Sequence, residues 1–550
     1  MNARRRFARM ALCAVVLVGA GAVRTSAHQG EPEALGTVHF PVSCEPGAQT
    51  TFTRGVALLH SFGYEEARMA FATVAEQDPR CGMASWGIAM TYYHPIWAPP
   101  TAADLNAGRA AAEKASAVGA RTDREVGYIA AIGAFYRDFE RVDHRARALA
   151  YRAAMEDLTR RNPGDHEVLI FYGLALLATA PPGDAAYTNQ KKAAEILLGL
   201  LREEPEHPGV VHYLIHAYDY PPLAALALPA ARTYARVAPA SPHALHMPSH
   251  IFTRLGLWSE SIESNLASAE AARRLVAKTH PGAASFDALH ALDYLEYAYL
   301  QKGDEAKARQ VLQEATAAKA FDDPNFAAGY ALAAIPARFA LERHRWDEAE
   351  SLEAPTANVP WERFAYAPAI SHFAQALGSA RAGEPQRARA ALAKLEEIHT
   401  ALVESSVPGP YDWAGQVDSM RQAAAAWLAY SEGRKDEAVN LARTAADLED
   451  RVGKHPVTPG AVLPARELLA DMLLEMGQPK EALGQYEASL REAPNRLNGL
   501  YGAARSAELA GDPRKAGQLY SRLLDNCGAS SVDRAEVRQA RDFLEHSTSR

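Results

Sequence analysis

A period of 34 residues near the C-terminus is the feature of this sequence that most limits its fold. Ala482 and Tyr486 recur 34 residues later as Ala516 and Tyr520, and Pro494 follows the first pair. A small residue followed four positions later by a large one, at this period, is typical of helical hairpins stacked in an array. One hairpin cannot bury its own apolar face, so its neighbours must do so. The sequence therefore predicts an all-α fold.

Other copies of the same pattern run along most of the chain. One copy contains Gly55, Ala67, Phe71 and Pro79, and weaker copies follow in the central and C-terminal parts. In such a repeat the small residues let two helices approach closely, the large residues fill the gap to the next hairpin, and the proline ends the second helix. We expect stacked hairpins over residues 50–526.

These positions resemble the tetratricopeptide repeat (TPR) family. The resemblance implies an all-α, right-handed superhelix of stacked TPR-like helical hairpins, followed by a capping helix and tail over residues 527–550. It also implies a concave groove that binds a peptide, a protein or a small ligand. The segments LLHSFGYEEA, YYHPIW, HYLIHAYDY, HMPSHIF and PARELLADMLLE resemble a group of exported bacterial TPR proteins. That narrower resemblance implies fold and export, but no particular activity.

The N-terminal residues are typical of an export signal. They combine a basic start, an apolar run too short to span a bilayer comfortably, and a small-residue exit near Ala27. Arg4 and Arg5 resemble the start of a twin-arginine signal. We therefore predict a signal peptide over residues 1–27, an extended segment over residues 28–49, and a periplasmic or secreted protein with no transmembrane span in its mature chain.

Charge and cysteine content limit the partners and the compartment. The formal net charge is -8, and it becomes more negative without residues 1–27, which carry five arginines and no acid. A nucleic-acid partner is therefore not expected. In an oxidising compartment, Cys44 and Cys81 are expected to form a disulfide, because they flank one helical hairpin that brings its ends together. Cys527 is left over, and no cysteine pair has zinc-finger spacing.

Histidines are concentrated in the central part of the superhelix, residues 207–300. When the repeats are aligned by their turn glycines and small residues, three successive helices place polar side chains toward one stretch of the groove. We predict a ligand-binding site made of His212, His216, Asp219, His243, His246, His250, His290, Asp293, Tyr294 and Tyr297.

The spacing of these histidines also suits a metal ion, because imidazoles one helical turn apart offer two nitrogens to one ion. The hypothesis is that a divalent transition metal such as zinc, copper or iron binds to His212, His216, His243, His246 and His250. Asp219 or Asp293 is expected either to complete the ligand shell or to orient a histidine by accepting its other ring proton. Pro248 is expected to bend the helix that carries three of these histidines.

The sequence leaves three functions open. The leading prediction is an exported TPR scaffold that binds a peptide, a protein or a small ligand in its concave groove. The alternative is a metal-binding protein or metal-dependent enzyme, although no compact motif such as HExxH indicates a reaction. The third is a structural spacer, in which the His, Asp and Tyr side chains form a satisfied polar network. Distances among these side chains distinguish the alternatives.

Overall fold

A computed structural model describes residues 34–96, 99–323, 325–355, 357–405, 411–528 and 534–548 of the chain. The predicted signal peptide, residues 1–27, lies outside the described residues, as does the first part of the predicted extended segment. Within the described residues, the only β-type pairing is one isolated bridge between Ala284 and Phe321. None of the described helices has the length and apolar character needed to cross a bilayer. The fold is an all-α helical repeat superhelix, as the 34-residue period predicts.

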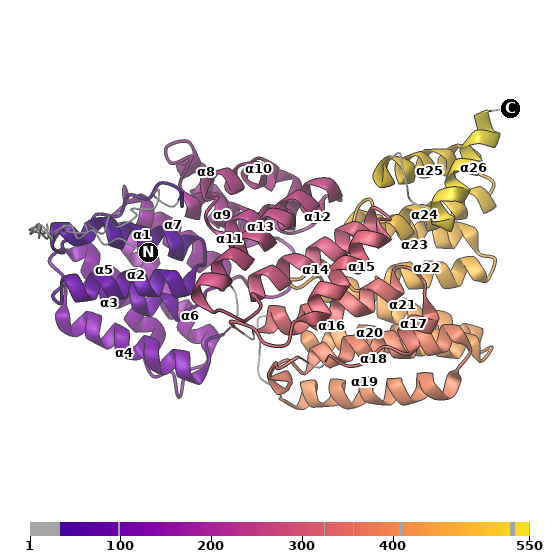
Figure 1. The fold of residues 1–550 in the computed structure, drawn as a ribbon, viewed down its shortest axis with the longest axis horizontal. Helices are drawn as coiled ribbons and strands as arrows, with labels where there is room; N and C mark the ends of the chain where they lie inside the picture. The colour runs from indigo at the N-terminus through magenta and orange to yellow at the C-terminus, as the bar shows by residue number, and fades with distance from the viewer. Residues whose placement is uncertain are drawn as a thin grey trace, which may run out of the picture. The chain divides into compact units, whose positions relative to one another are not determined.

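The helices follow one another as a series of hairpins (Figure 1). In the first half they are α1 Gln49–His60, α2 Tyr64–Gln77, α3 Gly82–Thr91, α4 Ala102–Val118, α5 Asp123–Tyr136, α6 His144–Arg161, α7 His166–Ala178, α8 Thr188–Leu201, α9 Pro208–Tyr218, α10 Leu228–Val237, α11 Pro242–His246, α12 Pro248–Arg254 and α13 Trp258–Thr279. In the second half they are α14 Phe286–Gln301, α15 Glu305–Ala317, α16 Phe326–Leu341, α17 Trp346–Glu350, α18 Tyr366–Ala382, α19 Pro385–Ser405, α20 Trp413–Ser431, α21 Lys435–Val452, α22 Ala465–Glu475, α23 Pro479–Glu492, α24 Leu497–Leu509, α25 Pro513–Cys527 and α26 Ala535–Thr548. Short 3-10 helices lie at Pro46–Ala48, Ala224–Ala227 and Trp361–Arg363.

Glycines opposite aromatic rings let neighbouring helices approach closely, both within a hairpin and between successive hairpins. A Cβ atom added to Gly55 on α1 would lie 2.8 Å from Cε1 of Phe71 on α2, which is closer than such atoms pack. Gly502 on α24 lies in the same way against the ring of Tyr486 on α23. Both rings are fully buried. The small and large positions of the repeat therefore contact each other directly, and that contact sets the helix spacing.

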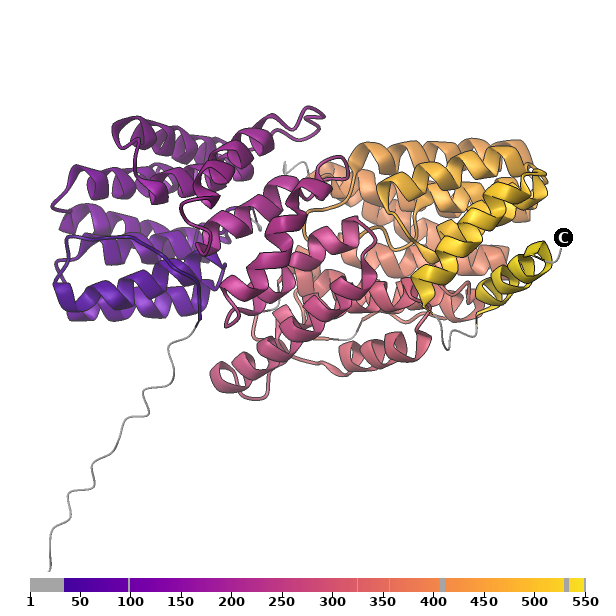
Figure 2. The ribbon, with the colours of Figure 1, turned by 90° about the horizontal axis from the view of Figure 1, so that it is seen from above.

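The hydrophobic core has two main parts that follow each other along the chain. The first part runs from Leu35 to Phe252, and the second from Leu289 to Ala540. In Figure 2 the helices that carry the first part are indigo to magenta, and those that carry the second part run through orange to yellow. The helices that carry the predicted site residues, α9, α11, α12 and α14, include the end of the first part and the beginning of the second. The candidate site therefore lies where the two parts of the core adjoin.

The superhelix curls tightly enough for helices distant in sequence to meet. Helix α14 contacts α24, and the indole Nε1 of Trp258 on α13 donates to the carbonyl oxygen of Asn495 at 2.8 Å. In the first part α1 contacts α9, and the hydroxyl of Tyr234 donates to Oγ of Ser61 at 3.1 Å. Contacts across the inside of the curl bury side chains that an open solenoid would leave in solvent.

The structure joins Cys44 and Cys81 in a disulfide, with their Cα atoms 5.0 Å apart. This bond ties the segment before α1 to the residue that precedes α3, as expected for cysteines that flank one hairpin. Cys527 is a free thiol, and burial raises its pKa to about 11. Because the thiolate is the reactive form, Cys527 is a poor nucleophile at neutral pH.

We predict that replacing both bridged cysteines, Cys44→Ser with Cys81→Ser, lowers the free energy of unfolding by about 3 kcal/mol. The bond closes a loop across 37 residues, so its loss frees the unfolded chain. Denaturant unfolding followed by circular dichroism, without reductant, measures the difference. Cys527→Ser is the matched control, because it removes a buried thiol and leaves the bridge intact. Equal transition midpoints for the wild type and the double variant would contradict a stabilising bridge.

Candidate metal centre

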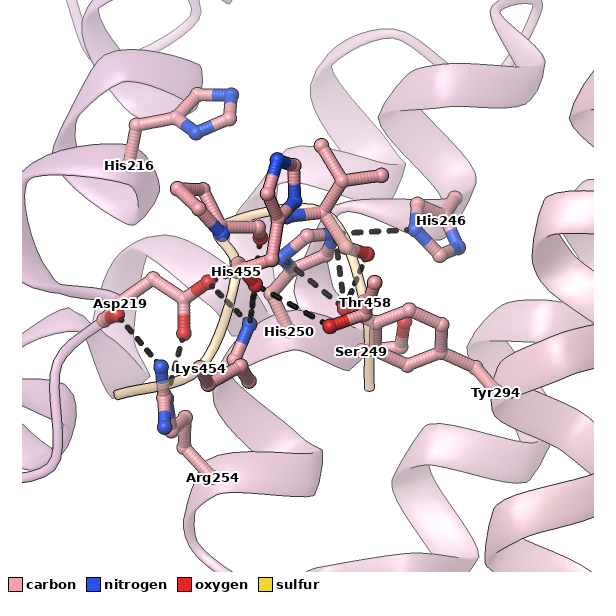
Figure 3. Close-up of polar contacts among 12 residues, drawn as sticks. His216, Asp219, His246, Ser249, His250, Arg254, Tyr294, Lys454, His455 and Thr458 are labelled. Atoms are coloured by element: carbon pink, nitrogen blue, oxygen red, sulfur yellow. Dashed lines mark hydrogen bonds and ion pairs between the residues drawn. The ribbon is translucent and has the colours of Figure 1, made fainter. Parts of the chain in front are cut away.

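Histidines from four helices meet at the junction of the two core parts. Figure 3 labels three of them, His216, His246 and His250. The contributing residues are His212 and His216 on α9, His243 and His246 on α11, His250 on α12 and His290 on α14. The helix predicted to carry three of them is divided into α11 and α12, and Pro248 is the first residue of α12. The bend falls at that proline because its ring nitrogen has no hydrogen to donate.

The six imidazoles form two groups of three, whereas the sequence predicted one set. The first triad is His212, His216 and His243, and the second triad is His246, His250 and His290. Within each triad the candidate ligand atoms all lie within 4.8 Å of one another. The triads adjoin, since the ring centroids of His216 and His250 are 6.4 Å apart, as are those of His243 and His246.

Hydrogen bonds fix the position of the ring proton on two members of the second triad. Nδ1 of His250 lies 3.0 Å from Oδ2 of Asp219, and an ionised carboxylate only accepts, so this Nδ1 carries the proton. Nδ1 of His246 lies 2.6 Å from Oδ1 of Asn265. The amide nitrogen of Asn265 donates to the carbonyl of Ser261, so its oxygen faces His246 and accepts from that ring. In both neutral rings Nε2 therefore carries no proton, and its lone pair is available.

These two lone pairs face each other, with the Nε2 atoms of His246 and His250 only 3.1 Å apart. Such an arrangement is repulsive unless a cation lies between the nitrogens. A proton is disfavoured, because burial lowers the pKa of both imidazoles. A metal ion suits the geometry, because ligand nitrogens 2.0–2.1 Å from a tetrahedral ion lie about 3.4 Å from each other.

The first triad has the same character. Nδ1 of His212 donates to the carbonyl oxygen of His60 at 2.7 Å, so its Nε2 accepts. This one lone pair faces Nε2 of His216 at 3.0 Å and Nε2 of His243 at 3.1 Å. Burial lowers the pKa of His216 to about 3 and lowers the pKa values of His212 and His243 as well. One ring N–H can use the lone pair of His212, whereas a metal ion can use all three nitrogens.

Asp219 orients the imidazole of His250 in the second triad. Its Oδ2 accepts from Nδ1 of His250 at 3.0 Å and from Nζ of Lys454 at 3.3 Å, and its Oδ1 accepts from Nε of Arg254 at 2.9 Å (Figure 3). Burial alone would raise the pKa of this carboxyl, but Lys454, Arg254 and His250 outweigh burial and hold the pKa far below its ordinary value. The carboxylate is therefore ionised and fixes the proton of His250 on Nδ1.

Two predicted site residues face other partners. Oδ1 of Asp293 accepts from the guanidinium of Arg338 at 2.6 Å, and the hydroxyl of Tyr297 accepts from Arg496 at 2.8 Å. The sequence predicts Asp293 at the histidine site, whereas in the structure its carboxylate pairs with Arg338. Arg338 is fully buried, so its charge needs the nearby carboxylate as a counter-ion. Tyr297 lies away from the triads and lines a cavity described below.

A segment distant in sequence covers the second triad. Residues 453–464, between α21 and α22, bring Lys454 to Asp219 and the carbonyl of Val457 within 3.0 Å of the hydroxyl of Tyr294 (Figure 3). His250 is consequently only 3% exposed. The prediction that these histidines form the wall of an open groove is therefore wrong, because they lie in the interior of the protein. Sequence reasoning missed this segment, although its glycines and prolines between two helical patterns were a signal.

A third cluster has similar spacing but satisfies itself. Nδ1 of His207 accepts from the backbone N–H of Gly209, so its Nε2 donates to Oε1 of Glu167 at 3.0 Å. Nε2 of His60 donates to Oε2 of Glu167 at 2.9 Å, and its Nδ1 accepts from the hydroxyl of Tyr213 at 3.0 Å. Each ring nitrogen has a partner of the opposite kind, so this cluster is a structural hydrogen-bond network.

Comparison with known proteins gives distant likenesses to solved helical structures. No family model matches the sequence, and no curated protein matches it. Among solved structures, yeast Tom70 is 12% identical with a TM-score of 0.33, over 92% of this chain and 96% of that chain. The TPR domain of P58(IPK) is 13% identical with a TM-score of 0.20, over 92% and 100%. The human IFIT1 dimer with m7Gppp-AAAA is 12% identical with a TM-score of 0.37, over 82% and 90%. Similarities this weak transfer no function.

We predict that Glu167→Gln lowers the free energy of unfolding by about 2–4 kcal/mol at pH 7, because the new amide N–H would face a buried imidazole N–H. Burial favours a raised pKa for Glu167, but His207 and His60 outweigh it and keep the pKa below the ordinary 4.5. The ionised carboxylate thus stabilises the fold above pH 4.5, and that stabilisation is lost as the pH falls further.

Urea unfolding at pH 7 and below pH 4.5 tests this sign. The difference between wild type and variant should shrink at the lower pH, while metal content stays unchanged. Glu113→Gln is the matched control at an exposed carboxylate. A variant as stable as the wild type at pH 7 would contradict the network.

Proposed function

We propose that this protein is a metalloprotein that holds two transition-metal ions in adjacent sites, one in each histidine triad. The observation that carries the proposal is the pair of Nε2 atoms of His246 and His250, 3.1 Å apart with both ring protons on the opposite nitrogens. Both triads consist of imidazoles alone. Imidazole ligands suit zinc, copper, iron and nickel, and we propose zinc or copper because no carboxylate belongs to either triad.

Neutral, oriented imidazoles are the form that a metal requires. Burial keeps the rings of both triads neutral, so an incoming ion does not have to displace protons at neutral pH. Asp219, Asn265 and the carbonyl of His60 accept the Nδ1 protons and aim Nε2 inward. Such outer hydrogen bonds normally support metal ligation.

Three protein ligands leave a tetrahedral ion with one open position. This is the arrangement of catalytic zinc sites, whereas structural zinc sites use four protein ligands. An ion of this kind lowers the pKa of a bound water or polarises a bound substrate. We therefore propose a metal-dependent enzyme in preference to a metal-stabilised spacer.

We also propose that the protein acts outside the cytoplasm and that its superhelix binds a peptide, a protein or a small ligand. The signal-like residues 1–27 support export. The disulfide between Cys44 and Cys81 supports it independently, because such bonds persist in oxidising compartments. Repeat superhelices commonly serve as binding scaffolds, which supports a bound partner.

We predict that the protein, purified without an affinity tag and equilibrated with zinc or copper, retains about two ions per chain, one for each three-histidine site. Mass spectrometry of the metals should find about one ion after His246→Ala with His250→Ala, and again about one after His212→Ala with His243→Ala. His39→Ala, at an exposed position, is the matched control. Wild-type protein that retains no metal would overturn the proposal, provided that circular dichroism shows it folded.

We predict that Asp219→Asn weakens metal binding at the second triad by about 10- to 100-fold, because the amide no longer fixes the proton of His250 on Nδ1. Competition with a chelator, starting from the protein with both sites filled, should show one ion released early and one retained. Asp293→Asn makes the same chemical change at the carboxylate that serves Arg338, and it should leave both affinities unchanged. Early release in neither variant, or in both, would contradict the orienting role of Asp219.

A further inference from the structure

We propose that a cavity beside residues 453–464 binds a small organic anion that contains a single aromatic ring. The proposal concerns residues outside the two triads and does not depend on bound metal. Its support comes from the size of the cavity, the nature of its walls, an unpartnered buried hydroxyl and the balance of nearby charges.

The cavity is the right size for one ring. Its volume is about 140 Å³. A protein cavity of about 150 Å³ is known to hold one benzene molecule. A six-membered ring with one small substituent at the open side therefore fits, whereas a fused ring system would require the walls to move.

The walls are rich in aromatic rings. Tyr330, Tyr366, Phe373, Tyr411 and Trp413 all line the cavity. The rings of Tyr366 and Trp413 stack on each other, with centroids 3.6 Å apart and planes 4° from parallel, so each covers one face of the other. Packed aromatic side chains favour a planar ring, which can lie parallel or edge-on to them. The walls therefore select planar ligands over puckered aliphatic rings of the same volume.

One polar atom in the wall lacks a hydrogen-bond partner in the part of the chain that the structure describes. The hydroxyl of Tyr366 is buried and makes no hydrogen bond to any of the described residues. Tyr366 is only 6% exposed. Buried hydroxyl groups are normally hydrogen-bonded, so this one indicates an additional molecule that donates to it or accepts from it. A carboxylate or hydroxyl substituent on the ring would do so.

The buried charge next to the cavity is positive. Arg254 and Lys454 both line the cavity, and both bind the single carboxylate of Asp219. Two cations thus share one anion, which leaves one positive charge without a counter-ion in this group. Unbalanced charge in a desolvated place is unfavourable, and an anionic ligand removes the imbalance.

The remaining charged groups of the cavity do not cancel this positive charge. Burial raises the pKa of Glu449 to about 8, so this carboxyl is mostly neutral at pH 7. Arg466 pairs with Asp447 and Asp450, and both of these carboxylates are exposed, so solvent screens the one negative charge in excess. Glu492 is exposed to solvent, which screens its charge. The electrostatic preference is therefore for an anion, with Lys454 and Arg254 as its partners.

Isothermal titration with four small probes tests the proposal on the full-length protein, with and without chelator. Benzoate combines a ring and a charge, cyclohexanecarboxylate has the charge on a puckered ring, benzyl alcohol has the ring without charge, and acetate has the charge alone. We expect benzoate to bind at least about tenfold more tightly than the other three, because only benzoate satisfies both the walls and the cations. The preference should persist in chelator, which separates this result from the metal proposal.

Three variants locate the binding. Met420→Trp fills the cavity from one wall and should abolish benzoate binding, whereas Lys454→Met should weaken it at least about tenfold. Tyr366→Phe should weaken it about fivefold by removing one hydrogen bond. Tyr430→Phe, on α20 and outside the cavity lining, is the matched control for the hydroxyl. Failure of benzoate to bind, equal binding of cyclohexanecarboxylate, or unchanged binding in folded Met420→Trp protein would each overturn the proposal.

Discussion

Burial of neutral imidazoles where two hydrophobic cores adjoin is the constraint on which the centre of this protein depends. Each ring nitrogen removed from water needs a partner of the opposite kind. In the triads the Nδ1 protons of His212, His246 and His250 go to protein acceptors, and their Nε2 atoms converge. In the His60, Glu167 and His207 cluster the same fold satisfies both nitrogens of each ring. The direction of the ring protons therefore distinguishes a candidate metal site from a structural network, and the number of histidines does not.

The curl of the superhelix explains why so many polar groups need partners inside. Arg496 is fully buried where α24 meets α14, and it pairs with Glu467 at 2.7 Å and with Glu342 at 2.7 Å. Arg338 on α16 is equally buried, and it donates to the carboxyl groups of Asp293 and Glu296. A buried charge without a partner is strongly destabilising. These ion pairs therefore stabilise only the arrangement of helices that brings the partners together. The ion pairs therefore help to select one curvature of the superhelix as well as to stabilise it.

Local patterns in the sequence predicted the parts of this fold that depend on neighbouring repeats. The alternation of small and large residues predicted the hairpins, and the repeat register predicted that α9, α11, α12 and α14 would bring their histidines together. The division into two triads was beyond prediction, because it follows from side-chain directions on either side of the bend at Pro248. The capture of Asp293 by Arg338 and the cover formed by residues 453–464 were also beyond prediction. Both arise from contacts between distant repeats, which depend on the summed curvature of many hairpins and not on any local period.

One carboxylate connects the histidines to the cavity. Asp219 ends α9, accepts from His250 on α12, and binds Lys454 from the covering segment and Arg254. The two cations draw electron density from the carboxylate, so they weaken it as an acceptor for the ring proton of His250. A ligand anion that shares those cations would strengthen that acceptor and make His250 a more basic metal ligand. Any such coupling acts equally in the opposite direction, because linkage between two binding equilibria is reciprocal. Asp219 thus links the second triad to the cations that line the cavity.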